Sequence, residues 1–224
     1  MKGRAREGTS KSRRPPVRDM DASAFAVILG ELISRLPGAY ACSLVDGSGE
    51  TVDYAGLGDP FDVKVAAAHA RILLNQVEEL GALGAPRWIV IRGAARSIIA
   101  RKLPEGYAIV VLLRRRAGFT ASERAFATCA AALAREAGWP LEAPERGGEA
   151  AWIPVDVEID QRGRPAFIGA PPVRVEVLGS VMGLPRRERG YRVRTAAGTE
   201  LTVVREAGNC WYADDRHDAY DALR

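Results

Sequence analysis

The sequence predicts an α+β fold in which one layered domain of helices and strands is followed by a small all-β domain. Over residues 20–139, segments with helical periodicity alternate with strand-like runs in the order α-ββ-α-βββ-α. Residues 140–150 contain Pro, Gly and three Glu, which is the composition of a linker. Beyond them, residues 151–215 contain only short strand-like runs separated by turn clusters. Strands are expected there at residues 152–159, 173–178, 191–195, 200–205 and 210–213. Two domains of ordinary size therefore follow one another along the chain.

The first helix is predicted from Asp21, a natural N-cap, to a stop at Pro37 and Gly38. Its apolar residues recur at helical spacing, at Phe25, Ile28, Leu29, Leu32, Ile33 and Leu36. Residues 39–45 then predict a buried strand, and residues 51–55 predict its hairpin partner. The Asp-Gly-Ser-Gly sequence between them supplies the positive φ angles that a hairpin turn requires.

A long second helix, three strands and a third helix complete the predicted domain. Asp59 caps the second helix, Pro60 occupies its first turn, and the helix runs to about Leu83. The strands are expected at residues 87–92, 97–102 and 107–114. Thr120 and Glu123 have capping-box spacing before the third helix, which Gly138 and Pro140 end.

The second helix is apolar on two sides, which makes it the candidate interaction element. One stripe consists of Phe61, Val65, Ala68 and Ile72. The opposite stripe consists of Val63, Ala67, Ala70, Leu74 and Val77. One sheet covers only one of them, so we expect the second, Ala-rich stripe to meet a second copy or another partner. The alternative is that both stripes are buried inside the monomer by the other helices or by the β domain.

Residues 20–139 resemble the roadblock/LC7 family. The resemblance lies in the order of elements, in Ala41 to Asp46 followed by Gly47, in the Ala-rich second helix and in the strand run Tyr107 to Leu112. It implies a homodimer formed through the second helix and its neighbouring strand. It also implies a non-enzymatic platform that binds a small Ras-like GTPase, in bacteria often as an activator or exchange-type regulator. The Arg114-Arg115-Arg116 run and the appended β domain are not features of this family.

Nothing in the sequence predicts catalysis or a cofactor. It contains no G-x-x-x-x-G-K-[ST] phosphate loop, no G-x-G-x-x-G and no G-x-S-x-G elbow. His69 and His217 have no partners at metal-ligand spacing, and three widely separated Cys suggest reduced thiols. The acidic cluster at residues 214–218 is interpreted as a solvated stretch leading into a C-terminal tail at residues 216–224. With no apolar run long enough to cross a bilayer and no signal peptide, the expected location is cytoplasmic.

Positive charge is concentrated at the start of the chain. The net charge of the whole sequence is +4, whereas residues 1–18 contain seven Lys or Arg and a single Glu. This segment has almost no apolar residue, so we expect a disordered basic tail. It would serve either as a tether to an acidic partner or simply as a solvated leader.

The β domain has one candidate binding face. Arg192 and Arg194 alternate with apolar residues on one strand, Arg205 on the next strand is expected to join them, and Trp211 follows. Such a face would bind nucleic acid by salt-sensitive contacts and stacking, and it supports the alternative function of a nucleic-acid-associated adaptor. The other interpretation is an ordinary polar outer face with Trp211 in the core. These strands also resemble, loosely, a small C-terminal β module of bacterial proteins related to Y-family DNA polymerases.

Overall fold

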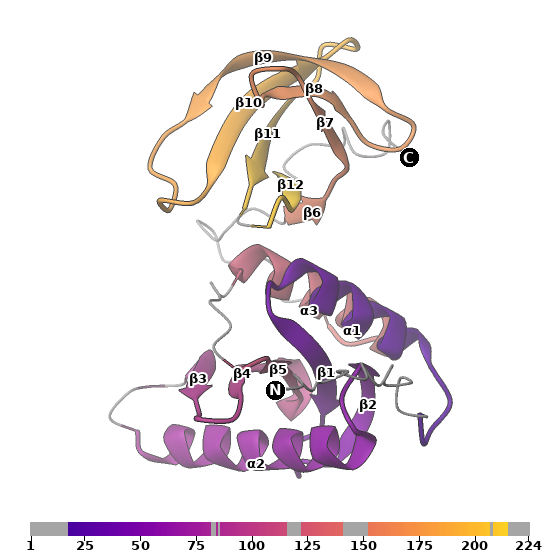
Figure 1. Ribbon diagram of the computed structural model, residues 1–224, viewed down its shortest axis with the longest axis vertical. Coiled ribbons are helices and arrows are strands. Elements are labelled where there is room, and N and C mark those ends of the chain that lie inside the picture. Colours follow the sequence, from indigo (N-terminus) through magenta and orange to yellow (C-terminus); the bar gives the residue numbers. More distant parts are fainter. Residues whose placement is uncertain are drawn as a thin grey trace, which may run out of the picture.

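Two antiparallel sheets and three α-helices form the described part of the chain (Figure 1). The computed structural model describes residues 18–81, 84, 86–115, 122–140, 152–206 and 208–214. All three helices and the first sheet lie in residues 18–140, called the N-terminal part below. The second sheet lies in residues 152–214, called the C-terminal part. The predicted α+β fold class and the predicted order α-ββ-α-βββ-α are confirmed.

The sheet of the N-terminal part has five antiparallel strands in the order β2-β1-β5-β4-β3. The strands are β1 (Ala39–Val45), β2 (Thr51–Gly56), β3 (Trp88–Arg92), β4 (Ser97–Lys102) and β5 (Ala108–Leu113). The helices are α1 (Ala24–Arg35), α2 (Pro60–Glu79) and α3 (Glu123–Ala137). Figure 1 shows α2 on one face of the sheet and α1 with α3 on the other. Alternate residues of the central strands therefore enter two different apolar cores.

Local side chains set the starts of the helices. Asp59 caps α2 as predicted, because its carboxylate accepts the backbone N–H groups of the first turn. The predicted caps of the other two helices were wrong by two residues. Ser23 caps α1 in place of Asp21, and Ser122 caps α3 in place of Thr120, which lies outside the described residues.

The C-terminal part is a sheet of seven strands in the order β6-β12-β11-β10-β9-β8-β7. The strands are β6 (Trp152–Pro154), β7 (Val157–Ile159), β8 (Pro165–Ile168), β9 (Val173–Val181), β10 (Arg189–Thr195), β11 (Glu200–Arg205) and β12 (Trp211–Asp214). The sequence predicted one strand over residues 152–159 and missed β8. Two strands replace the one because β6 and β7 lie at opposite edges of the sheet, so the chain must change direction between them.

The C-terminal part packs on α1 and α3, the side of the N-terminal part away from α2 (Figure 1). The guanidinium of Arg124 on α3 pairs with Glu188 at 2.7 Å and with Glu206 at 2.8 Å. Nearby, the Thr128 hydroxyl donates to the carbonyl of Trp152 at 2.9 Å. Tyr212 of β12 is fully buried in the same apolar core as α1 and α3. Tyr212 therefore joins the C-terminal part to one of the two apolar cores of the N-terminal part.

The predicted boundary of the N-terminal tail was one residue too long. Arg18 is held by the carboxylate of Asp53 and by the carbonyl of Tyr54, so it belongs to the folded part. Residues 1–17, all but Pro140 of the predicted linker at residues 140–150, and the predicted tail at residues 216–224 lie outside the described residues. Within the described ranges, none of the helices combines the length and the apolar character needed to cross a bilayer.

Candidate functional site

The Ala-rich stripe of α2 faces the protein's own sheet. Val63, Ala67, Ala70 and Leu74 are at most 1% exposed and pack in one core with strand residues such as Ala41. Val77, at the end of the stripe, is half-buried. Assigning Val63, Ala67, Ala70, Leu74 and Val77 to the partner interface was therefore wrong. The physical reason is that small side chains on the helix and on the strands let the two backbones approach closely.

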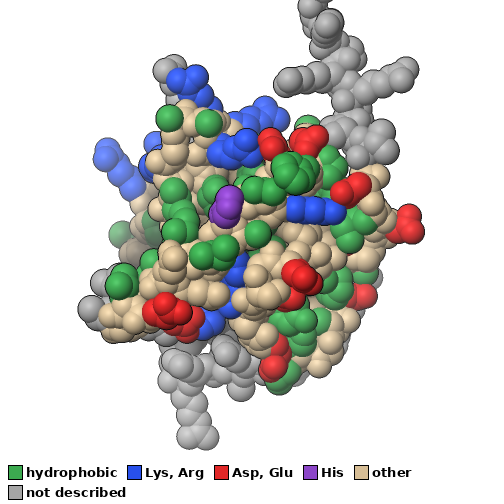
Figure 2. Space-filling model, turned by 90° about the horizontal axis from the view of Figure 1, so that it is seen from below, with side chains coloured by type: hydrophobic (Ala, Val, Ile, Leu, Met, Phe, Trp, Pro, Cys, Tyr) green, Lys and Arg blue, Asp and Glu red, His purple; other side chains and the backbone are tan. Residues whose placement is uncertain are grey.

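The other stripe of α2 is the one that reaches solvent. Its large apolar residues, called the outer stripe below, are Phe61, Val65, Ile72, Leu73 and Leu80, between 37% and 72% exposed. The sequence had placed Phe61, Val65 and Ile72 on this side but had assigned the side to the sheet. Figure 2, which views α2 from outside, shows hydrophobic side chains gathered around a histidine. Soluble monomers seldom expose a continuous row of this kind.

Strand β3 is an open edge of the sheet beside this helix. It pairs with β4, and no described strand pairs with its other side. Arg87 and Gly93 make their backbone bonds towards the β4 hairpin. By the alternation of antiparallel ladders, the main-chain groups of Trp88 and Val90 point away from β4. Val90 is also 45% exposed. This edge was not predicted from the sequence, although the unbroken apolar run Trp88 to Ile91 was a usable signal.

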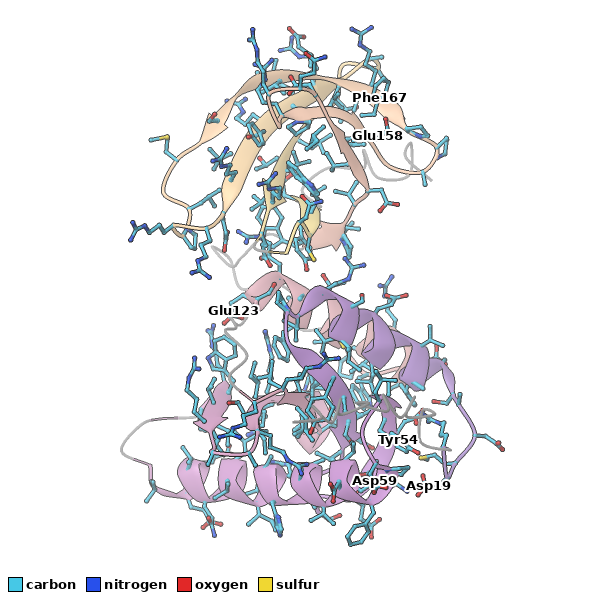
Figure 3. All side chains as sticks on the ribbon, in the orientation of Figure 1. Asp19, Tyr54, Asp59, Glu123, Glu158 and Phe167 are labelled. Carbon is cyan, nitrogen blue, oxygen red and sulfur yellow. The ribbon has the colours of Figure 1, made fainter. Side chains whose placement is uncertain are left out.

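The opposite edge, at β2, is covered by the segment that precedes α1. The Arg18 guanidinium donates to the carbonyl of Tyr54 and stacks over its ring, 4.5 Å from the ring centre. The Tyr54 hydroxyl donates to Asp19 at 2.7 Å, and Lys64 of α2 pairs with the same carboxylate at 2.8 Å. These bonds, first from Lys64 and then from Tyr54, lower the pKa of Asp19. Figure 3 shows Asp19 beside Tyr54, near Asp59 at the start of α2. Within the described residues, the segment before α1 thus covers part of the β2 edge, whereas no described segment pairs with the outer side of β3.

A buried arginine fixes the position of α2. Arg71 lies on α2 and carries a charge, yet it is only 5% exposed. Its guanidinium donates to the carbonyls of Asp46, at 3.3 Å, and Gly106, at 2.8 Å, and to the side chain of Asn75. Charge-assisted bonds to two loops hold the helix rigidly, so the outer stripe is presented in one orientation.

The predicted basic face of the C-terminal part is partly neutralised by one glutamate. Arg192 and Arg194 do share an exposed face, but both pair with Glu200, at 2.9 Å and 2.6 Å. Hydrogen bonds from Arg194 and then Arg192 lower the pKa of Glu200. Arg205 does not join them, because it pairs in register with Arg189 and so projects to the other side of the sheet. That part of the prediction was wrong.

Trp211 is buried in the core of the C-terminal part, with 4% exposure. It therefore offers no face on which a nucleic-acid base can stack. Together with the pairing of both arginines to Glu200, this favours the interpretation of an ordinary polar outer face over a nucleic-acid surface.

The other residues that were considered as metal ligands or reactive groups do not come together in one site. Among the described residues, no group of three or more His, Cys, Asp or Glu side chains is placed to hold a metal ion. His69 is exposed on α2, and His217 lies outside the described ranges. Cys42 and Cys129 are buried free thiols whose pKa values are raised mainly by burial, in the case of Cys129 to about 12. Cys210 is a third free thiol, only partly buried.

Comparisons with solved structures find partial likenesses. A roadblock/LC7 domain from Streptomyces avermitilis is 21% identical, with a TM-score of 0.38 over 49% of this chain and 88% of that chain. Myxococcus xanthus MglB is 15% identical, with a TM-score of 0.44 over 53% and 98% of the two chains. The gliding protein MglB from Thermus thermophilus is 17% identical, with a TM-score of 0.43 over 52% and 93%.

No protein-family model matches the sequence, and no curated protein matches it either. The loose resemblance of the C-terminal strands to a module of Y-family polymerase relatives finds no support in these comparisons. The structural likenesses are too partial to give any residue a role.

Proposed function

We propose that this protein is a non-catalytic interaction protein that forms a two-fold homodimer through α2 and β3, and that the dimer binds a small Ras-like GTPase. The observation that carries the dimer is the exposed outer stripe lying next to an open sheet edge. An apolar helix face and an unpaired strand are each unfavourable in water. A second copy of the same surface covers both.

The geometry of α2 places its outer stripe next to the open edge of β3. Asp62 of α2 pairs with Arg96, at the β3–β4 turn, at 3.4 Å. Leu73 lies about three helical turns after Asp62, so it projects on the side of α2 that faces β3. Leu73 and the edge of β3 therefore form one surface. Leu73 is 41% exposed and Val90 is 45% exposed, which leaves apolar area on both elements.

Two-fold symmetry favours a second copy as the occupant. When one strand pairs antiparallel with a copy of itself, the pair has a two-fold axis by construction. Pairing of two β3 strands extends one sheet into the other and turns the Leu73 side of each α2 towards its mate. The covered β2 edge leaves β3 as the edge for such pairing.

The GTPase partner is supported by the resemblance of residues 20–139 to the roadblock/LC7 family, whose members serve as platforms for such proteins. The absence of a phosphate loop from the sequence agrees with a regulator that does not itself bind nucleotide. Activation, nucleotide exchange and scaffolding are all compatible with this platform.

A charge placed on the outer stripe tests the dimer. Leu73 is 41% exposed, so Leu73→Glu should leave the melting temperature of the monomer unit unchanged, because surface changes cost within about 0.5 kcal/mol. In the dimer it brings like charges into a desolvated contact, so light scattering should show a monomer. The matched control is Ile159→Glu on β7, a similarly exposed residue at 47%, which should stay dimeric.

Ala70→Glu should have the opposite effect, because it should lower the stability of the fold itself and not only the association. Ala70 is fully buried on the sheet, so the variant should lose stability by several kcal/mol whatever its oligomeric state. A monomeric wild type, or a dimeric Leu73→Glu variant, would refute the proposed interface. Capture of a GTP- or GDP-loaded Ras-like GTPase by the wild-type dimer tests the second half separately, and an intact dimer that captures none disproves the GTPase partner alone.

A further inference from the structure

His69 is exposed on α2, and it is the only histidine of the described residues. In Figure 2 it is the purple side chain, and hydrophobic side chains lie around it. At about 100° per residue it projects about 40° from Leu73, on the side of α2 that faces β3. Its neighbours one turn away in either direction are all apolar, and they are Val65, Ala66, Ile72 and Leu73. His69 therefore belongs to the surface that the proposed homodimer covers.

Two ion pairs fix the position of α2 along the β3–β4 hairpin. Near the start of α2, Asp62 pairs with Arg96, which precedes β4, at 3.4 Å. Near the end of α2, Glu78 pairs with Lys102, the last residue of β4. The stretch of helix between the two pairs is about 24 Å long, and the stretch of strand is about 20 Å long. The helix therefore runs along the hairpin, and each level of α2 can be assigned to a level of the strands.

The middle of α2 lies level with the middle of β3. Midway between the two ion pairs are Ala70 on α2 and Ile99 on β4, and Ile99 pairs with Val90. Val90 is the middle residue of β3, so a two-fold axis that pairs the whole strand with its copy passes through Val90. The same axis places His69 of one copy opposite His69 of the other.

No uncompensated carboxylate of the described residues lies close to this axis. Asp62 and Glu78 are each about two helical turns or more from His69, and both already pair with a cation. Glu79 makes no ion pair with a described side chain, but it lies about 15 Å from His69 along the helix. That separation exceeds the screening length of about 8 Å at physiological ionic strength.

The other charged groups around this surface are cations or lie on other sides of the helix. Arg87 and Arg92 stand at the two ends of β3 and add positive charge. Arg71 is buried on the opposite side of α2, and Lys64 pairs with Asp19 at the β2 edge. By symmetry, the second copy brings the same groups. Among the described residues, a proton on His69 therefore meets apolar surface and positive charge, and no carboxylate that balances it.

We propose that protonation of His69 dissociates the homodimer, so that the α2–β3 interface responds to pH. This inference rests on the proposed dimer and adds its regulation. Histidine is the side chain whose charge ordinarily changes between about pH 5 and 8. Neutral imidazoles pack within the apolar surface, whereas two imidazolium ions face each other in a desolvated contact. The dimer thus disfavours the proton, and association is present at the upper end of this pH range and lost as the pH falls.

The dissociation constant of the full chain, measured by analytical ultracentrifugation at pH 7.5 and pH 5.5, tests the proposal. In the wild type it should be larger at pH 5.5 by roughly tenfold or more, because each copy must release a proton to associate. In His69→Gln the ratio of the two constants should fall to about one, whatever the affinity of the variant. His69→Lys carries its charge at both pH values and should be as weakly associated at pH 7.5 as the wild type is at pH 5.5.

The matched control is His217→Gln, which replaces the other histidine of the sequence and should keep the wild-type ratio. A wild type that is monomeric at pH 7.5 refutes the homodimer itself, and this proposal with it. A wild-type dimer with the same dissociation constant at both pH values overturns the pH response and leaves the dimer standing. A ratio that persists in His69→Gln does the same. Circular dichroism should show equal helix content at both pH values, and loss of helix at pH 5.5 would assign the effect to unfolding and overturn the proposal.

Discussion

Replacing Arg124 with methionine should loosen the contact between the N-terminal and C-terminal parts. The Arg124 guanidinium lies between the carboxylates of Glu188 and Glu206, and the three side chains are only 14%, 15% and 9% exposed. Burial by itself disfavours the charged form of Arg124, but hydrogen bonds to Glu206 and Glu188 outweigh it and raise its pKa. Methionine fills similar space and leaves two buried carboxylates without a cation.

The expected cost follows from this burial. Removing one partner of a buried ion pair typically costs about 3–5 kcal/mol, because the remaining charge is desolvated without compensation. That is a large share of the roughly 5–15 kcal/mol that stabilises a protein domain. It also corresponds to at least a hundredfold change in the docking equilibrium, at about 1.4 kcal/mol per factor of ten.

Urea unfolding followed by tryptophan fluorescence measures the effect. Trp152 is a local reporter, because the Arg124 guanidinium lies 4.5 Å from the centre of its ring. The wild type should unfold in one transition, and Arg124→Met should unfold in two, with the C-terminal part released first. Adding Glu188→Gln and Glu206→Gln to this variant should recover most of the loss, since no unpaired charge then remains.

Arg135→Met is the matched control on the same helix. Arg135 is exposed, so its replacement should change the unfolding free energy by less than about 0.5 kcal/mol. If Arg124→Met unfolds at the same urea concentration as this control, the ion pairs contribute nothing to docking and the reasoning is refuted.

Two further predictions concern the thiols and the N-terminus. At pH 8, iodoacetamide should modify Cys210 first, because burial raises the pKa of Cys129 to about 12 and that of Cys42 well above its ordinary value. Rapid labelling of Cys42 in the folded protein, seen by peptide mass spectrometry, would contradict this. Deleting residues 1–17 should leave the melting temperature nearly unchanged, whereas deletion through Arg18 should lower it by exposing the β2 edge. Equal melting of the two truncations would show that Arg18 contributes nothing.

Much of the secondary structure could be predicted because its causes are local. The strands at residues 97–102 and 200–205 have the predicted bounds, since Gly or Pro turns delimit short apolar runs. Asp59 and Pro60 mark the start of α2 for the same reason. Strand β8 was missed because four residues beginning with Pro165 are too short for a periodic signal.

The orientation of α2 depended on tertiary packing. The helical period shows that two apolar stripes exist, but it is the same for both and does not say which one meets the sheet. That choice depends on the side chains opposite, and the small strand residues Ala41, Ala100 and Ala108 accept the stripe that contains Ala67 and Ala70. The candidate interface is therefore the outer stripe of α2 and not the Ala-rich stripe, which packs on the sheet.

The sequence by itself determined the fold class, the order of the elements and the existence of a doubly apolar helix, because these depend on residues close together in the chain. Only the tertiary structure decided which charged groups are buried and paired. Arg124 meets carboxylates 64 and 82 residues away, and Arg71 bonds to a carbonyl 35 residues away. The periodicity of the sequence does not identify such partners, because they depend on the three-dimensional packing that brings distant segments together.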